Sequence, residues 1–265
     1  MFFVLKKRLM KTVELKKTTH NYKTGDEPEE LPPTLFEDSL FVIDKKPIGF
    51  YLSQLPEKAQ KLADVADFEL NSRRVPKLVM TRSGGLWDRD QEVKQYSCII
   101  GSIPPKRHMR RGYATKSSVH AVDSARTFVK AMIMLGRECL RSVEEIAPTI
   151  YQVHKKAVEE RVPERWRFAD LFTSSISNYN IASPMHQDRL NVKGAVNCII
   201  TRRRNSTGGN LHVPDFATTF NSVNNSLLVY PAWRNMHGVT PIVPTHHNGY
   251  RNSLIWYALD AFYDF

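Results

Sequence analysis

Cysteine, long apolar runs and acidic residues are all scarce in this sequence of 265 residues. Its three cysteines (Cys98, Cys139 and Cys198) have no metal-type spacing, and so few favour a reducing intracellular compartment over a disulfide-stabilised secreted fold. No apolar run approaches the roughly 20 residues that span a bilayer. At the N-terminus the apolar residues precede the basic ones, which is the reverse of a signal peptide. We therefore expect an intracellular protein, cytoplasmic or nuclear, with no membrane partner.

The shortage of acidic residues leaves a strongly basic chain. Lys and Arg number 38 and Asp and Glu 27, which gives a net charge of +11. Such a balance favours a polyanionic partner, most often nucleic acid, although a generally basic solvated surface explains it equally well. Basic residues cluster in segments 1–20, 106–116 and 202–204. Contacts between these clusters and phosphates would weaken steeply with salt.

The length suits one large domain. We predict a single catalytic domain with a basic arm and loop (1–35), a supporting region of mixed strands and helices (36–165) and a barrel core (166–265). Local patterns in the first hundred residues predict short elements: a strand or short helix at 2–5, a strand at 40–43, a helix at 53–62, a turn at 83–85 and a strand at 96–100.

Two helices are predicted in the middle of the chain. Apolar residues spaced by four, three and four indicate one buried helical face: Phe128, Met132, Leu135 and Cys139. Asp123 or Ser124 is suited to cap this helix. Ser142–Glu145 has the pattern of a capping box, and a second helix is expected from Pro148 to about Arg161. Both should pack on one outer face of a sheet.

From residue 172 onward the pattern changes to short apolar or alternating runs separated by Gly, Pro and Asn. These runs cover 172–181, 195–201, 210–213, 217–220, 226–230, 239–243 and 253–258. Short strands in series without intervening helices are typical of a jelly roll. We predict an α+β fold, a double-stranded β-helix (jelly roll) with flanking helices, whose open end is a natural ligand site.

His186 and Asp188, together with one distant histidine, provide the residue types of a 2-His-1-carboxylate site for non-haem Fe(II). A His-x-Asp triplet alone is common on surfaces, but His186 follows a strand-like run. His237 precedes an apolar segment that could form a strand, which makes it the favoured third ligand. His246 and His247 are alternatives, but they lie in a Pro- and Asn-Gly-containing turn, and we interpret them as exposed loop residues.

Arg251 and Ser253 are two residues apart in a strand-like run, so they should face the same side. A guanidinium buried in a barrel needs a carboxylate partner. A dicarboxylate cosubstrate could supply it, and so could an Asp or Glu of the chain.

Several motifs, in the order in which they occur, resemble those of Fe(II)/2-oxoglutarate-dependent dioxygenases. They are most similar to the TET/JBP branch, which oxidises the methyl group of 5-methylpyrimidines in DNA. The motifs are His186-x-Asp188-x-x-Asn191, Thr201-Arg202 at a strand end, Gly208-Gly209-x-Leu211-x-x-Pro214, His237-Gly238-x-x-Pro241 and Arg251-x-Ser253 followed by Leu254 to Tyr257. The resemblance covers about residues 172–262. The Cys-rich zinc modules of animal TET proteins are absent from this sequence, which therefore resembles a minimal catalytic domain.

The resemblance implies a role for each of these residues. His186, Asp188 and His237 would ligate Fe(II), while Arg251, assisted by Ser253, would bind the far carboxylate of the cosubstrate 2-oxoglutarate. O2 would be the other cosubstrate. Two further residues would contact a flipped base of double-stranded DNA: Asn191 at its polar edge and Tyr257 by stacking. The implied product is 5-hydroxymethylcytosine from 5-methylcytosine, with no obligate protein partner evident.

Other functions remain open at this stage. The branch often has a base-reading histidine where this chain has Leu259, so thymine in DNA is an alternative target. Asn178-Tyr179 resembles a pattern of AlkB-like nucleic-acid demethylases, although the second arginine of that group is missing after Arg251. A protein or small-molecule hydroxylase and a non-catalytic basic DNA-binding jelly roll are the remaining alternatives.

Overall fold

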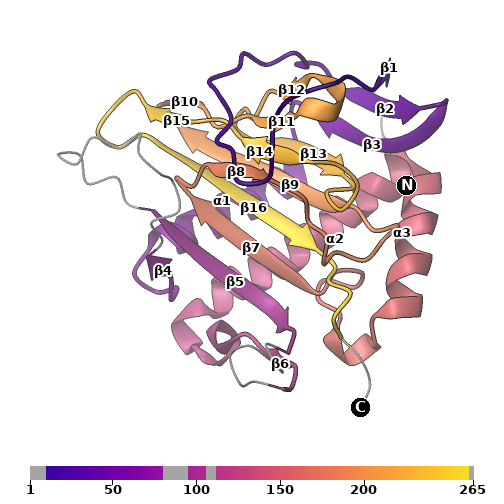
Figure 1. Ribbon diagram of the computed structural model, residues 1–265. Helices are drawn as coiled ribbons and strands as arrows, with labels where there is room; N and C mark the ends of the chain where they lie inside the picture. Colours follow the sequence, from indigo (N-terminus) through magenta and orange to yellow (C-terminus); the bar gives the residue numbers. More distant parts are fainter. Residues whose placement is uncertain (1–9, 80–94, 106–111, 263–265) are drawn as a thin grey trace, which may run out of the picture.

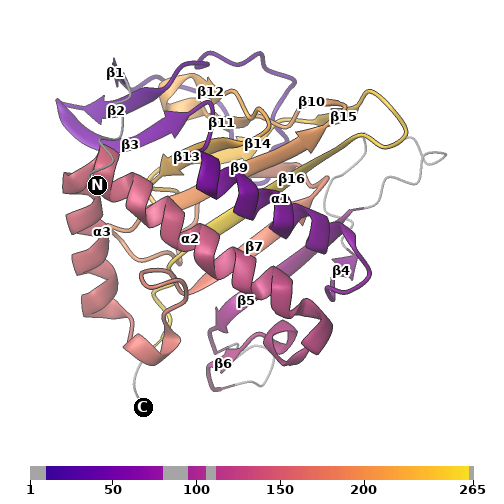
Figure 2. The ribbon, with the colours of Figure 1, turned by 180° about the vertical axis from the view of Figure 1, so that it is seen from behind.

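The computed structural model describes residues 10–79, 95–105 and 112–262. The predicted elements at 2–5 and 83–85 and the basic residues 106–111 lie outside these ranges. In the described part, two β-sheets face each other and helices cover the outer face of the larger one (Figures 1 and 2). The α+β jelly roll with flanking helices is therefore confirmed.

The larger sheet has the strand order β1-β2-β3-β13-β9-β16-β7-β5-β4, with β6 attached to β5. Only β1 and β2 pair in parallel among the described strands. Its strands are β1 (Lys11–Glu14), β2 (Ser39–Ile43), β3 (Lys46–Leu52), β4 (Leu78–Val79), β5 (Tyr96–Ile103), β6 (Thr115–Lys116), β7 (Ser174–Tyr179), β9 (Asn197–Arg204), β13 (Ser226–Tyr230) and β16 (Tyr250–Tyr257). The predicted strands at 40–43 and 96–100 correspond to β2 and β5. Strands from the first 120 residues thus extend this sheet at both ends.

The smaller sheet has the order β12-β11-β14-β8, and a separate pair of strands joins β10 to β15. These strands are β8 (Ser183–His186), β10 (Ser206–Gly208), β11 (Leu211–Val213), β12 (Thr218–Phe220), β14 (His237–Val239) and β15 (Ile242–Pro244). Each of the seven runs predicted from residue 172 onward contains strand residues. The run at 239–243 is divided between β14 and β15, while β8 and β10 were not predicted.

Three α-helices lie behind the larger sheet: α1 (Glu57–Asn71), α2 (Arg126–Ile146) and α3 (Pro148–Arg161) (Figure 2). The bounds of α3 match the prediction. The helix predicted at 53–62 begins later, because Pro56 lacks an N–H and suits only a helix start, and it continues further. Its buried face runs from Ala59 through Ala66 to Leu70. No described helix has the length and apolar character that crossing a bilayer requires.

The predicted buried face of α2 is confirmed, because its four apolar residues are at most 1% exposed. Both predicted caps are wrong. Asp123 and Ser124 lie in a separate 3-10 turn, and Ser124 Oγ donates to the Arg74 carbonyl oxygen (2.8 Å). Ser142 lies inside α2, where its hydroxyl donates to the Glu138 carbonyl oxygen (3.1 Å). The helix continues through Ser142 because burial of the next residue, Val143, outweighs the local capping pattern.

A glycine on α2 allows this helix to pack against the strand β16. Trp256 of β16 donates its indole N–H to the Met132 carbonyl oxygen (3.1 Å). A Cβ atom on Gly136 would lie 2.7 Å from Trp256 Nε1 and 2.8 Å from Ala169 Cβ. A side chain at position 136 would therefore push the helix away from the sheet.

We expect Gly136→Ala to lower the free energy of unfolding by about 1–3 kcal/mol, because overpacking outweighs the better helix propensity of alanine. Urea denaturation of the purified variant measures the change. Gly112→Ala is the matched control, since a Cβ at Gly112 meets no atom within 4 Å. Equal losses of stability in the two variants would contradict this packing role.

The basic cluster at 202–204 does not form a free cationic surface. Arg202 is 8% exposed and donates to Asp64 Oδ1 (2.5 Å) and to Asn225. Arg203 donates to the carbonyl oxygens of Gly208 (3.1 Å) and Ser222 (2.9 Å). The hypothesis that this cluster binds phosphate is therefore wrong for Arg202 and Arg203, because both guanidinium groups bind protein oxygens.

Candidate metal centre

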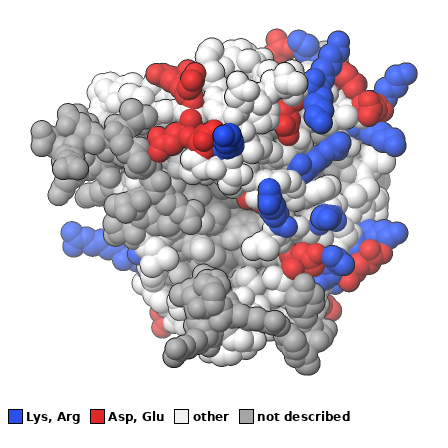
Figure 3. All heavy atoms as spheres, viewed as in Figure 1, with Lys and Arg blue, Asp and Glu red and all other residues white. Residues whose placement is uncertain are grey.

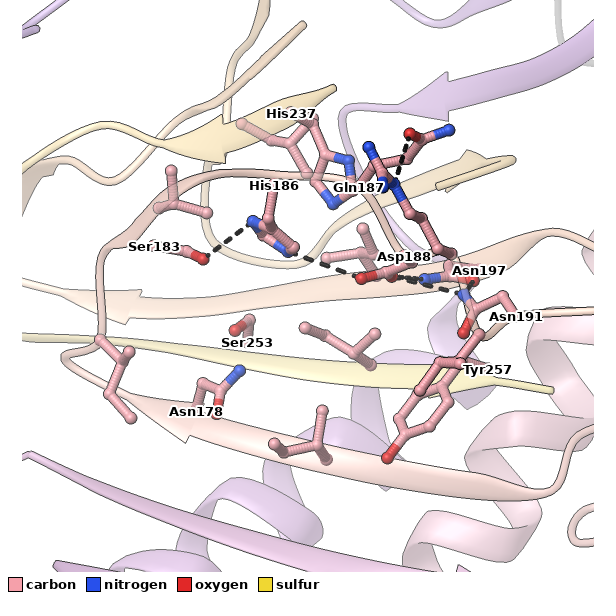
Figure 4. Close-up of a pocket in the computed structure, with 18 of the residues that line it drawn as sticks. Asn178, Ser183, His186, Gln187, Asp188, Asn191, Asn197, His237, Ser253 and Tyr257 are labelled. Atoms are coloured by element: carbon pink, nitrogen blue, oxygen red, sulfur yellow. Dashed lines mark hydrogen bonds and ion pairs between the residues drawn. The ribbon is translucent and has the colours of Figure 1, made fainter. Parts of the chain in front are cut away.

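His186, Asp188 and His237 converge on one point between the two sheets. His186 ends β8 and His237 begins β14, and these antiparallel strands place the two histidines directly opposite each other. Asp188 follows in the loop after β8. One possible ligand atom from each residue lies within 4.8 Å of the other two, and His186 Nε2 is 3.5 Å from Asp188 Oδ1 (Figure 4). The structure thus brings together the three residues that sequence analysis selected as metal ligands.

Hydrogen bonds to carbonyl oxygens fix which nitrogen of each imidazole is free. His186 Nδ1 is 2.8 Å from the Pro184 oxygen, and His237 Nδ1 is 3.1 Å from the Asn235 oxygen. Since a carbonyl oxygen only accepts, each Nδ1 carries a proton, and Nε2 is the nitrogen with the lone pair when the imidazole is neutral. Burial, reinforced by His186, lowers the pKa of His237 to about 4. A neutral imidazole with a free Nε2 is the form that binds a metal.

Two asparagine side chains hold the carboxylate of Asp188. Asn197 Nδ2 donates to Asp188 Oδ2 (3.0 Å), and Asn191 Nδ2 donates to the same oxygen (3.3 Å) and to Asn197 Oδ1 (2.9 Å). This leaves Oδ1 on the side of His186 (Figure 4). Asn191 lines the cavity beside the metal ligands. The two hydrogens of its amide group already bind Asp188 and Asn197, so they would not be available to a base without breaking these bonds. The contact of Asn191 with a base stays a prediction.

Sequence analysis missed Asn197, although a signal was present. Asn197 and Ile199 alternate along β9, so they share the face that lines the cavity. Asn197 is the polar residue of this pair and is only 3% exposed. A buried asparagine at the start of an apolar strand needs hydrogen-bond partners, which here include Asp188.

We expect Asn197→Ala to weaken Fe(II) binding about 10- to 100-fold, because outer partners of metal ligands have effects of this size. Asp188 would lose one of the two donors that orient its carboxylate. Anaerobic titration with Fe(II) measures the affinity. Asn248→Ala on an exposed loop is the matched control, and a variant of Asn197 that binds Fe(II) as tightly as this control would refute the role.

The three candidate metal ligands line a cavity of about 550 Å³ between the sheets. Its opposite wall comes from β7 and β16, where Asn178, Ser253 and Tyr257 face the ligands (Figure 4). The apolar lining includes Ile176, Ile181, Leu190, Ile199, Leu211, Val239, Ile255 and Leu259. This volume and mixed lining are typical of small-molecule sites.

Arg251 lines the same cavity and has no acidic partner among the described residues. It is 2% exposed, and its Nε is buried without a hydrogen-bond partner. Burial, with the nearby Arg203, lowers the pKa of Arg251 to about 9. A Cβ on Gly209 would lie 3.2 Å from Arg251 Cδ, so this glycine leaves room for the arginine stem. Of the two alternatives for Arg251, the structural ion pair is absent from the described part of the chain.

The other predicted residues lie along the same strand. Ser253 is 2% exposed and faces the cavity with Arg251, as their spacing predicts. Tyr257 also lines it, and burial raises the pKa of its phenol to about 12. Leu259 completes this end of the wall, and its backbone bridges to Asn191. His246 and His247 are exposed loop residues away from this group, as predicted.

The sequence matches no protein-family model, and it matches no curated protein. The structure is similar to that of NgTET1 in complex with 5mC DNA, with a TM-score of 0.57 and 12% identity over 95% of this chain and 83% of that one. At this identity the similarity shows that the two chains share a fold. A 2OG-Fe(II) oxygenase-family protein from Burkholderia pseudomallei has a TM-score of 0.48 and 13% identity over 79% of this chain and 84% of that one. OsALKBH1 has a TM-score of 0.42 and 12% identity over 80% of this chain and 98% of that one.

Proposed function

We propose that this chain is an Fe(II)- and 2-oxoglutarate-dependent dioxygenase that oxidises the 5-methyl group of 5-methylcytosine in DNA to 5-hydroxymethylcytosine. The observation that carries the oxygenase is one cavity that contains both a His-Asp-His group and a buried guanidinium with no acidic partner among the described residues. The first suits a metal ion, and the second suits the carboxylate of a small acid. The DNA substrate rests on the motif resemblance, the basic charge and the similarity to NgTET1, which was determined with 5mC DNA.

The residues present fit Fe(II) and 2-oxoglutarate. Two imidazole Nε2 atoms and one carboxylate oxygen form a donor set for non-haem Fe(II). Arg251 and Ser253 would hold the far carboxylate of 2-oxoglutarate. Bound together, Fe(II), 2-oxoglutarate and O2 would supply the oxidation of a C–H bond, with one oxygen atom ending in the hydroxymethyl group, the other in succinate, and CO2 released.

The chain's own contribution is to place the target methyl group. The metal ligands lie inside a cavity between two sheets, which a base stacked in a duplex does not reach, so the target nucleotide must flip out at a cost of a few kcal/mol. The aromatic ring of Tyr257 would form one wall for this base. Asn191 would lie at its polar edge, next to Asp188.

Thymine in DNA is the second candidate target. Leu259 lines the cavity where the TET/JBP branch often has a base-reading histidine. An apolar side chain there provides no hydrogen bond to the exocyclic amino group that distinguishes 5-methylcytosine from thymine. Selection between the two bases would then depend on Asn191.

The experiment is oxidation of DNA by the purified protein with Fe(II), 2-oxoglutarate and ascorbate, analysed by nucleoside mass spectrometry. One DNA contains 5-methylcytosine, and a matched DNA contains thymine as its only 5-methylpyrimidine. We expect 5-hydroxymethylcytosine from the first, with an equal amount of succinate. A hydroxymethyl product from thymine alone would identify the second target. Turnover of an amino acid or free metabolite with no DNA product would overturn the DNA substrate.

A further inference from the structure

An exposed apolar side chain lies at the rim of the cavity that the candidate metal ligands line. Leu190 is 71% exposed, the highest value among the exposed large hydrophobic residues of the described chain, and it also lines the cavity. It follows Asp188 by two residues and precedes Asn191, which is only 5% exposed. The loop that carries a metal ligand therefore also presents a leucine to whatever approaches the opening.

The backbone of this loop is fixed at several points. Gln187 Nε2 donates to the Trp233 carbonyl oxygen (2.6 Å), and the Asp260 N–H donates to the Leu190 carbonyl oxygen (2.8 Å). Asn191 pairs with Leu259 through a β-bridge. An anchored loop can insert a side chain into a partner without first being ordered, so little conformational entropy is lost on binding.

Basic residues are close to Leu190 in the loop sequence and in the segment that anchors the loop through Gln187. Arg189, Lys193 and Arg234 are exposed, and none has an acidic partner among the described residues. Arg234 is joined to this loop through its carbonyl oxygen, which accepts from Gln187 Nε2 (3.3 Å). The nearby carboxylate of Asp260 is already paired with Arg161 (2.6 Å). Figure 3 shows several Lys and Arg side chains, with Asp and Glu among them, on the right of the face seen in Figure 1. This rim thus combines one apolar tip with free positive charge, which suits a nucleic-acid duplex.

We propose that Leu190 enters the DNA duplex and fills the space left by the flipped nucleotide, while Arg189, Lys193 and Arg234 contact the flanking phosphates. This inference rests on the proposed function and adds the device that holds the base outside the duplex. Flipping leaves a gap between unstacked neighbours, and an apolar side chain inserted there offsets part of the unstacking free energy. Single-stranded DNA has no such gap, so the wedge acts only on a duplex.

The test compares Leu190→Ala with the wild type on three DNAs of one sequence: a matched duplex, a duplex with an abasic site opposite the target, and the single strand. We expect kcat/KM to fall about tenfold on the matched duplex, which corresponds to about 1.4 kcal/mol. The other two DNAs should change less than threefold. Leu190→Met should retain duplex activity. Phe68→Ala, a change at another exposed apolar residue on α1 behind the larger sheet, is the matched control.

A second measurement does not depend on oxidation. Duplex DNA with 2-aminopurine beside the target brightens when stacking is lost, and the wild type should raise this fluorescence more than Leu190→Ala does. If no DNA is oxidised but this difference is present, the proposed oxidation fails and the wedge stands. The wedge is overturned if the two proteins give the same fluorescence, if duplex turnover is unchanged, or if Leu190→Ala slows all three DNAs equally.

Discussion

Replacing Asp188 by alanine is expected to reduce oxidation at least about 1,000-fold, because a carboxylate ligand both binds the metal ion and fixes its geometry. Asp188 is the acidic member of the three-residue group and approaches His186 Nε2 within 3.5 Å. Its side chain is 30% exposed, so its removal opens no buried cavity and the variant should fold. Succinate release and nucleoside mass spectrometry measure turnover, and anaerobic Fe(II) titration measures binding.

A measurement of DNA binding distinguishes loss of catalysis from loss of DNA binding in this variant. Asp188→Ala should bind DNA at least as tightly as the wild type, because the change removes a negative charge near the opening. Asp123→Ala is the matched control, since Asp123 is exposed and forms an ion pair with Arg126 on the surface. Turnover of Asp188→Ala at the level of this control would exclude the metal centre. No turnover in the wild type or in either variant, together with normal DNA binding, would favour the non-catalytic module.

The three candidate metal ligands could be predicted because short segments of the sequence contain residue types that bind metals, next to runs that form strands. His186 and Asp188 are two residues apart, and a strand that ends at His186 places both near one opening. His237 could be chosen over His246 and His247 because only His237 adjoins an apolar run able to form a strand. In the structure β8 and β14 pair with His186 opposite His237, so His237 is the histidine that lies beside His186 and Asp188.

Contacts between distant segments could not be predicted in the same way. Asn197 reaches Asp188 only because β9 lies beside β13 in the larger sheet and the loop after β8 passes over it. The partner of Arg251 also stayed open, because any Asp or Glu of the chain could have been folded against it. Strand register decides such questions, and register depends on the whole sheet.

Local signals misled where burial opposed them. Ser142–Glu145 has the residues of a capping box, but packing of α2 against the sheet keeps this segment helical. Arg202 and Arg203 form a basic run in sequence, yet β9 turns them toward carbonyl and carboxylate oxygens of the protein. A cluster of like charges in sequence is therefore a weaker sign of a binding surface than unpaired charges in the fold, such as Arg189 and Arg234.

Replacing Arg251 by methionine is expected to have opposite effects on stability and on cosubstrate binding. Arg251 is 2% exposed and lacks an acidic partner among the described residues. The cost of burying its charge is therefore poorly offset in the ligand-free protein. Methionine has a similar stem without the charge. We expect the free energy of unfolding of the ligand-free protein to rise by about 1 kcal/mol or more, as when apolar residues replace buried charges.

Cosubstrate binding should change in the other direction. Loss of a buried, charge-assisted partner costs about 2–4 kcal/mol, so the KM for 2-oxoglutarate should rise about 30- to 1,000-fold. In the wild type loaded with Mn(II), 2-oxoglutarate at 100 times its Kd should add about 2.7 kcal/mol of stability, and the variant should lose this gain. Thermal or urea unfolding with and without 2-oxoglutarate measures both quantities.

A surface arginine provides the matched control. Arg137 pairs with Asp170 and both side chains are more than half exposed, so Arg137→Met should change stability by less than about 1 kcal/mol and leave the KM unchanged. A variant of Arg251 that is less stable without ligand would mean that the guanidinium is paired within the protein. A variant that keeps the wild-type KM would mean that the acid binds elsewhere. We expect Arg251→Met to be more stable than the wild type without ligand and to bind 2-oxoglutarate more weakly. This combination indicates an arginine that is buried without an acidic partner and binds an anionic cosubstrate.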